Sequence, residues 1–144
     1  MIFSKRRAKR IAVELPVKVY FFDNKEKNRI GEPLAGSIKN FSPLGAALTV
    51  GAILLNGKHL FYACQDNSEI VLELVFELGA GCADQFIAVP AEPVWFDKDL
   101  GLGKKEFDVG VKFLVDSKSP EIRALCKEAC EDEKRRISLW KKFF

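Results

Sequence analysis

Two polar stretches of the chain contain the residue types that recognise a small anionic ligand. Five of the six residues from Lys5 to Arg10 are Lys or Arg, and the stretch from Asn40 to Gly45 combines an amide, a hydroxyl, a proline and a glycine. A guanidinium group pairs bidentately with phosphate or with the O6/N7 edge of guanine, and it stacks on flat rings. Together the two stretches predict a site for an anion with planar bases, although either alone would be an ordinary charged terminus or turn.

The positive charge of the chain is concentrated at its two ends. The net charge is +3, whereas residues 5–10 and residues 134–144 contribute +5 each, so the remaining body is near −7. A protein that binds a nucleic-acid polymer usually spreads its basic surface over one face of the fold. The pattern therefore favours local capture of a ligand, and we do not expect a nucleic-acid polymer as a partner.

The composition is that of one globular domain. The chain has 144 residues, of which 48% are hydrophobic and 30% charged, and this is enough for a sizeable core. The longest apolar run, from Ala46 to Leu55, is about half as long as a membrane-spanning helix. The N-terminus is charged where a signal peptide would be apolar, so we expect a cytoplasmic protein.

The residues that would support catalysis or metal binding are few. Four cysteines, Cys64, Cys82, Cys126 and Cys130, and the single His59 follow none of the common zinc spacings. The four-residue spacing of the last two leaves a metal site or a redox pair open, but buried reduced thiols are the preferred interpretation. No nucleophile has a base at a recognisable spacing. We therefore expect no enzyme, no catalytic residue and no metal ligand.

Alternation of apolar and polar residues predicts six β-strands. They span residues 11–21, 34–39, 45–50, 70–78, 86–96 and 107–115. Pro16 on the outward side of the first strand indicates an edge position or a bulge. Residues 51–68 show no readable pattern, and residues 97–106 are expected to form a hairpin loop. Six strands at short spacing favour an antiparallel barrel or sandwich.

A helical period follows the last strand. Ser119 is suited to cap the helix and Pro120 to occupy its first position. An apolar stripe follows at residues 122, 125, 126 and 129, which predicts one helix of roughly twenty residues over one mouth of the barrel. The expected organisation is a flexible basic arm at 1–10, a barrel at 11–118 and a C-terminal helix at 119–144. The basic tail leaves contact with a partner or an anionic membrane open, but a helix end covering the barrel is preferred, and we do not expect a membrane partner.

Taken together, the two polar stretches resemble the paired signature of PilZ domains, which are bacterial receptors for cyclic di-GMP. Arg6 and Arg10 match an RxxxR motif before a strand, and Asn40, Ser42 and Gly45 match an NxSxxG motif thirty residues further on. Val94 and Trp95 on the fifth predicted strand and the sequence DVGVKF at 108–113 are also similar to the family. The likeness extends over residues 5–115.

The resemblance implies an all-β fold with one C-terminal helix, a six-stranded antiparallel barrel whose outer surface binds the dinucleotide. Arg6 and Arg10 would hold guanine edges and phosphates, and Arg7 would add a stack or a phosphate contact. Ordering the arm costs about 1–2 kcal/mol per residue, and each charge-assisted hydrogen bond returns roughly 1.5–3 kcal/mol. Several contacts must therefore form together, and we expect the arm to fold across the barrel when the ligand binds.

The turn would supply the remaining contacts. The resemblance implies that Asn40 hydrogen-bonds a guanine, that Ser42 hydrogen-bonds a phosphate or base, and that Gly45 keeps the turn open. Asn40 stands where the family also has Asp, so this contact brings no charge. Whether Trp95 is a core residue or a platform for stacking stays open.

The leading interpretation is a receptor that binds cyclic di-GMP and relays the signal to an effector protein by conformational change. An alternative is a PilZ-like scaffold for protein contacts that no longer binds the nucleotide. A third interpretation, a binder of nucleic acid or membrane through the basic ends, is disfavoured by the acidic body. The number of bound ligands, one or a stacked pair, stays open.

Overall fold

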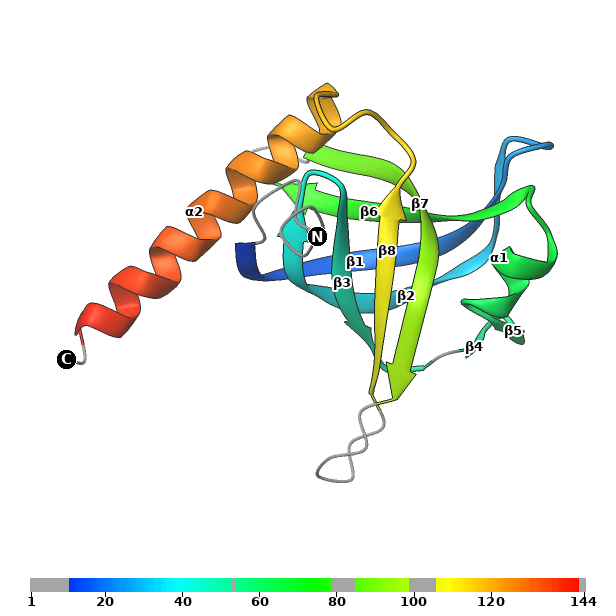
Figure 1. The fold of residues 1–144 in the computed structure, drawn as a ribbon, viewed down its shortest axis with the longest axis horizontal. Coiled ribbons are helices and arrows are strands. Elements are labelled where there is room, and N and C mark those ends of the chain that lie inside the picture. The colour runs from blue at the N-terminus through cyan, green and yellow to red at the C-terminus, as the bar shows by residue number, and fades with distance from the viewer. Residues whose placement is uncertain (1–10, 53, 79–84, 99–105, 143–144) are drawn as a thin grey trace, which may run out of the picture.

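Six long strands form one closed antiparallel barrel in the order β1-β2-β3-β8-β7-β6 (Figure 1). The computed structural model describes residues 11–52, 54–78, 85–98 and 106–142, and every structural statement concerns these residues. At residues 11, 12, 78, 85, 98 and 135–142 only the backbone is described. The strands are β1 (Ile11–Asp23), β2 (Asn28–Ser42), β3 (Gly45–Val50), β6 (Ile70–Leu78), β7 (Gln85–Lys98) and β8 (Phe107–Phe113). Of the barrel and the sandwich that the alternating pattern left open, the structure has the barrel, as the resemblance implied.

The core fills the barrel with the inward residues of each strand. In β1 the odd-numbered residues from Val13 to Phe21 are buried, whereas Glu14, Pro16 and Lys18 are exposed. This two-residue period is the one expected for a strand with one buried face. Pro16 lies in the part of β1 that has no partner in β6, because pairing between these strands starts at Lys18. The missing N–H of the proline therefore costs no bond on that side.

Several strand boundaries differ from the sequence prediction. Strand β2 runs from Asn28 to Ser42, well beyond the predicted 34–39, because its polar residues face solvent while their backbone pairs with β1. Strands β1 and β2 are joined by a tight turn in which Lys27 has a φ of 59°. Strand β8 ends at Phe113 rather than at residue 115.

The unreadable segment between β3 and β6 closes one end of the barrel. It contains a small two-stranded sheet, β4 (Leu54–Leu55) and β5 (Lys58–His59), followed by the short helix α1 (Tyr62–Asp66). Leu55 and Leu60 are buried here. Each element is too short to show a period, so the sequence gives no pattern from which to predict it.

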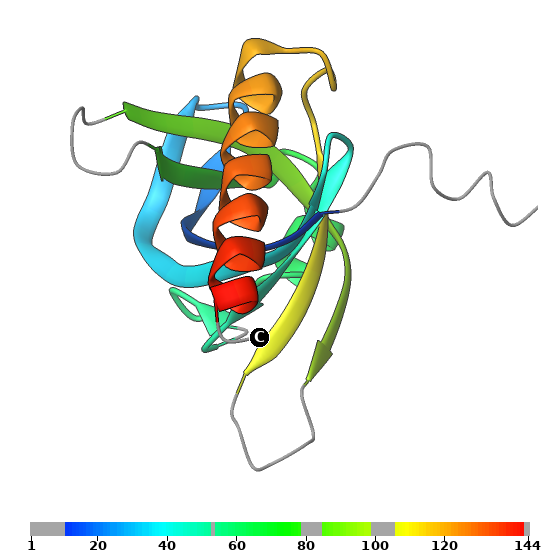
Figure 2. The same cartoon turned by 90° about the vertical axis from the view of Figure 1, so that its left-hand side faces the viewer.

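The helix α2 (Pro120–Lys142) lies across the opposite end of the barrel (Figures 1 and 2). Its residues Ile122, Leu125 and Ala129 are fully buried, as the predicted stripe requires. The Oγ of Ser119 accepts a hydrogen bond from the N–H of Ile122 at 3.4 Å, which is the geometry of an N-cap. No helix in the described ranges is long and apolar enough to cross a membrane.

Strand β1 is staggered with respect to its neighbour β6. Only its second part, Lys18–Asp23, pairs with β6, and residues 11–17 pair with β2 alone. Helix α2 packs mainly against β1. The beginning of β1 therefore lies between β2 on one side and the helix on the other.

Candidate functional site

The outer face of β2, β3, β8 and β7 contains the described residues of the predicted site. Asn40 pairs with Ala47, Ala47 with Gly110, and Gly110 with Trp95, so these residues form one row across four neighbouring strands. Neighbouring strands are about 4.8 Å apart, and the row therefore spans roughly 14 Å between its ends. Asn40 and Trp95 are exposed, and the two residues between them, Ala47 and Gly110, are small. We call the surface over Ala47 and Gly110 the low floor of the site; the amide of Asn40 lies at one end of it and the indole of Trp95 at the other.

A second row lies two residues further along the same strands. Ser42 pairs with Gly45, Gly45 with Lys112, and Lys112 with Glu92. Residues two apart on a strand point to the same face, so the Ser42 hydroxyl and the exposed Lys112 ammonium group lie on the Asn40 side of the sheet. The sequence interpretation assigned no role to Lys112. Its place opposite the glycine of the turn follows from strand register, which the motif spacing does not reveal.

Ser42 also organises the turn that joins β2 to β3. Its Oγ accepts a hydrogen bond from the N–H of Leu44 at 3.3 Å and donates one to the carbonyl of Gly45 at 3.4 Å. The donated bond is longer than a normal O–H···O bond. A phosphate oxygen above the turn would compete for this proton at little cost, so the hydroxyl can serve both the turn and a ligand.

Gly45 is required by the packing of the barrel. A Cβ atom at this position would lie far inside contact distance of the Val111 carbonyl oxygen on β8. This contact is with the neighbouring strand, so the glycine is needed with or without a ligand.

Trp95 lies on the outer surface of the barrel. Its side chain is 45% exposed, and a Cβ atom on Gly110 would collide with the indole ring. A shift in the β7–β8 register between Pro93 and Trp95 leaves Val94 and Trp95 both exposed. The alternative of a core tryptophan is therefore wrong, and the indole covers the glycine as a flat, accessible ring.

Acidic residues border the first row on the side away from Lys112. Asp97 and Asp108 are directly paired across β7 and β8, and Thr49 Oγ1 donates to Asp108 Oδ1 at 3.0 Å. Two carboxylates opposite one another repel each other and also repel an anion. The face is thus close to neutral where Lys112 pairs with the exposed Glu92, and it is acidic near Asp108.

The three predicted arginines, Arg6, Arg7 and Arg10, lie outside the described residues. The first described residue, Ile11, pairs with Phe41, which stands between Asn40 and Ser42 in the chain. A fully extended chain spans at most about 3.6 Å per residue, so a residue five positions before Ile11 can be up to roughly 18 Å from this pair. The basic segment therefore joins the barrel directly beside the two rows.

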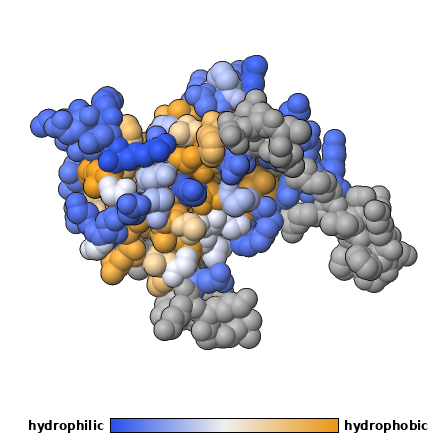
Figure 3. Space-filling model, turned by 180° about the vertical axis from the view of Figure 1, so that it is seen from behind, coloured by the Kyte–Doolittle hydropathy of each residue, from blue (hydrophilic) through white to orange (hydrophobic). Residues whose placement is uncertain are grey.

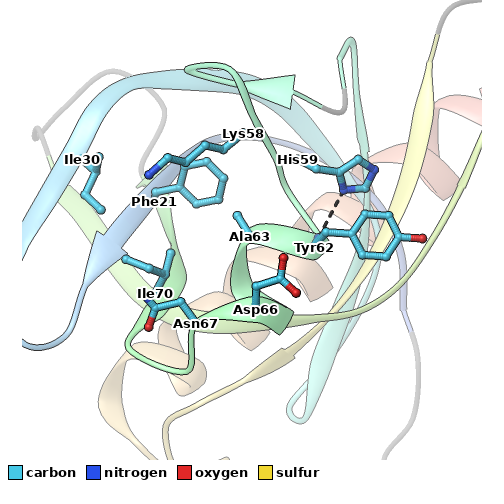
Figure 4. Close-up of a pocket in the computed structure, with 9 residues that line it drawn as sticks. All are labelled: Phe21, Ile30, Lys58, His59, Tyr62, Ala63, Asp66, Asn67 and Ile70. Atoms are coloured by element: carbon cyan, nitrogen blue, oxygen red, sulfur yellow. Dashed lines mark hydrogen bonds between the residues drawn. The ribbon is translucent and has the colours of Figure 1, made fainter.

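A separate cavity of about 370 Å³ lies at the other end of the barrel. Its lining includes Phe21, Ile30, Ile70, Lys58 and Asp66 (Figure 4). None of the predicted site residues lines it. The dinucleotide predicted from the motifs therefore has its candidate site on the outer face, away from this cavity.

His59 belongs to the segment that forms this end. Its Nδ1 accepts hydrogen bonds from the backbone N–H groups of Phe61 at 3.1 Å and Tyr62 at 3.3 Å (Figure 4). Its ring also lies edge-on to Phe96, with 4.8 Å between centroids. Burial lowers the pKa of His59 from its ordinary value of 6.5. The neutral imidazole is thus a structural acceptor that starts α1.

The thiols and carboxylates do not form a metal centre in the part of the chain that the structure describes. No group of three or more His, Cys, Asp or Glu side chains could hold an ion there. Burial, with a smaller contribution from Cys130, raises the pKa of Cys126, and burial, with Glu92, raises that of Cys64 to about 12. A protonated thiol is a poor ligand and a poor nucleophile. Cys82 lies outside the described residues.

On the side away from the viewer in Figure 1, a central area of hydrophobic surface is surrounded by hydrophilic residues (Figure 3). The exposed tip of the β1–β2 hairpin, residues 24–27, is entirely polar.

Three solved structures share this fold. The PilZ domain of YcgR from Escherichia coli, with c-di-GMP, is 10% identical over 96% of this chain and 98% of its own, with a TM-score of 0.59. The Bacillus subtilis inhibitor of motility MotI/DgrA is 16% identical over 92% of this chain and 52% of its own, with a TM-score of 0.54. PlzA from Borreliella burgdorferi, in complex with c-di-GMP, is 16% identical over 96% of this chain and 54% of its own, with a TM-score of 0.52.

These similarities concern the fold. The chain has the fold of a PilZ domain, as its motifs predicted, and it spans about half the length of the MotI and PlzA chains. No protein-family model matches the sequence, and no curated protein matches it.

Proposed function

Because this chain has the fold of a PilZ domain, we propose that it is a receptor for cyclic di-GMP and that the ligand binds on the outer face of β2, β3, β8 and β7. The observation that supports this most directly is the convergence of Asn40, Ser42 and Trp95 on one face, although the chain separates the first and last by more than fifty residues. Beside them β1 begins, at the point where the basic segment joins the barrel.

The polar and aromatic groups of the face suit the two kinds of group in the ligand. A guanine offers hydrogen-bond donors at N1 and N2, for which the Asn40 carbonyl oxygen is an acceptor. The indole of Trp95 is a flat surface on which a base can stack, at roughly 1–3 kcal/mol per base. The phosphates would lie toward Ser42 and Lys112, away from the acidic pair of Asp97 and Asp108. The acidic pair disfavours a long polyanion, because such a ligand would extend over Asp97 and Asp108 and be repelled by them.

Arg6 and Arg10 would complete the site from the basic segment. Two guanidinium groups can take a phosphate and a guanine edge at the same time, and Arg7 would add a further contact. In this proposal the closing of the segment over the ligand changes the surface that an effector protein meets. The protein then acts as a binding module in the cytoplasm, without chemistry of its own.

Isothermal titration calorimetry with cyclic di-GMP tests the proposal. We expect a dissociation constant in the micromolar range, about −8 kcal/mol, and a loss of at least tenfold in affinity in Arg6→Ala, Arg10→Ala and Ser42→Ala. Lys25→Ala, at the far tip of the β1–β2 hairpin, is the matched control and should bind as the wild type does.

Two other results would each favour a different function. Absence of binding by the folded wild type would overturn the receptor proposal and favour a scaffold for protein contacts. Equal affinity for cyclic di-GMP, heparin and single-stranded DNA would show general attraction of anions to the basic ends. Neither is expected, because the face presents an amide, a hydroxyl and an indole rather than an unbroken basic surface.

A further inference from the structure

We propose that Asp132 of α2 is a positioning residue for the nucleotide: it holds the bulge of β1 from which the basic segment departs, and it thereby couples α2 to the site. This inference rests on the proposed function, because it concerns how the same site is held in place and read out. It is supported by the pairing of β1, by two contacts of Glu14 and by the burial of α2.

The start of β1 contains a bulge. Ile11 pairs with Phe41 and Ala12 with Asn40, but the next regular pair is Leu15 with Ile38. Val13 and Glu14 therefore stand opposite the single residue Lys39. A bulge disrupts the ladder locally and bends its strand, so the path of the first residues of β1 depends on how these two residues are held.

Glu14 is held from two sides. Its backbone N–H donates a hydrogen bond to Asp132 Oδ2 at 3.1 Å, and its carboxylate accepts two from Lys39 Nζ, at 2.9 and 2.7 Å. The first contact joins residues 118 positions apart in the sequence. Glu14 thus connects the helix, the beginning of β1 and strand β2.

Lys39 continues this connection into the site. It directly precedes Asn40 in β2, and the β2–β3 register shifts at the same place, since Ile38 pairs with Leu48 and Asn40 with Ala47. Lys39 thus lies at the register shift that precedes Asn40, and the same Lys39 binds the Glu14 carboxylate. A displacement of Glu14 would be felt both by Asn40 and by the chain that precedes Ile11.

The helix supplies a firm anchor for Asp132. One turn before it Ala129 is fully buried, and Ile122 and Leu125 fill the end of the barrel. In this region β1 has no partner in β6, so no β6 carbonyl is available to the N–H of the exposed Glu14. The carboxylate of Asp132 provides an acceptor from an element that cannot shift without disturbing the core.

Coupling of this kind is reciprocal. If the helix holds the bulge in the conformation that binds nucleotide, bound nucleotide must favour the attached state of the helix by the same factor. Binding at β2 and β3 is then expected to stabilise α2, which lies across one end of the barrel and is available to an effector.

Hydrogen–deuterium exchange with and without cyclic di-GMP, read together with calorimetry, tests the proposal. In the wild type we expect the ligand to slow exchange at residues 13–14 and 120–134. In Asp132→Ala we expect fast exchange at Glu14, affinity weakened by about fivefold or more, and no ligand response in α2. Asp132→Asn keeps an acceptor oxygen and should keep both properties, and Glu131→Ala, an exposed neighbour, should behave as the wild type.

The proposal is overturned if α2 does not respond to ligand in a wild type that binds it, or if Asp132→Ala keeps both affinity and response. If Asp132→Asn and Asp132→Ala lose the same amount of affinity and of ligand response in α2, the hydrogen bond to Glu14 is not the coupling element. If the Asp132→Ala variant fails to fold, the exchange experiment on the wild type still tests whether ligand binding changes exchange in α2. A failure of the proposed function is distinguishable, because it appears as absence of calorimetric binding by the wild type.

Discussion

The indole of Trp95 lies over Gly110, its cross-strand partner on β8. A glycine in the middle of a strand usually weakens a sheet, because it has no side chain to pack. Here the aromatic ring covers the bare backbone, and the glycine in turn lets the ring lie close to the barrel. The flat surface at one end of the proposed site is thus a property of the pair.

Gly110→Ala is expected to displace the indole and so to weaken the binding of cyclic di-GMP. The added methyl group meets the ring well inside contact distance, and overpacking of this kind costs typically about 1–3 kcal/mol. Urea denaturation and calorimetry measure the two effects. Gly51→Ala is the matched control, because a Cβ atom there meets nothing within 4 Å. Unchanged stability and affinity in Gly110→Ala would contradict this packing.

Leu125→Ala is expected to lower the free energy of unfolding by about 2–5 kcal/mol. Its side chain is fully buried between α2 and the barrel, so truncation leaves a cavity that the rigid strands cannot fill. Arg123→Ala, exposed on the same helix, should change stability by less than about 0.5 kcal/mol. Denaturant titration of both variants gives the comparison, and similar small losses would show that the helix does not pack here.

His59 is expected to make the protein less stable in mild acid. Burial lowers the pKa of His59 in the folded state below the unfolded value of 6.5, so folding favours the neutral ring. The contribution of the neutral His59 ring to the free energy of unfolding is fully present above pH 6.5. It is lost as the pH falls below this value toward the pKa of His59 in the folded state.

The unfolding free energies of the wild type and His59→Asn, measured between pH 8 and pH 5, isolate this effect. The wild type should lose more stability than the variant over this range, because the variant keeps an acceptor near the Phe61 and Tyr62 amides without a titrating group. Parallel curves for the two proteins would show that the imidazole does not titrate with folding.

Cys64 is expected to resist alkylation in the folded protein. Its pKa is raised to about 12, first by burial and second by Glu92, so almost no thiolate is present at neutral pH. Cys130 is exposed and should react first with iodoacetamide, as peptide mass mapping after short labelling would show. Labelling of Cys64 at the rate of Cys130 in native protein would contradict the burial, whereas labelling after denaturation is the positive control.

The local patterns of the sequence predict most of the fold. Alternation in β1 and β6 reports which face is buried, because a closed barrel has one apolar inside and one solvated outside. The stripe through Ile122 and Leu125 likewise reports the buried side of α2. The segment with β4, β5 and α1 is not predictable in this way, since its elements are too short for a hydrophobic period to repeat.

The site is predictable only in part. The chemistry of Asn40 and Ser42 is legible in the motif, as are their common face and their turn. The alignment of Trp95 with Asn40 is not, because it depends on the register of three strand pairs and on a bulge in β7. The contact of Glu14 with Asp132 joins distant parts of the chain, and no local period indicates it.

The low floor between Asn40 and Trp95 makes the proposed receptor easy to silence. The side chain of Ala47 lies on the outer face of β3, where the barrel core does not depend on its size. A bulky residue that favours strands, such as Ile or Tyr, would therefore fit β3 but would occupy the space above the row. A single codon change could thus abolish recognition and leave the barrel intact. Proteins with such a substitution would keep the barrel fold and no longer bind cyclic di-GMP.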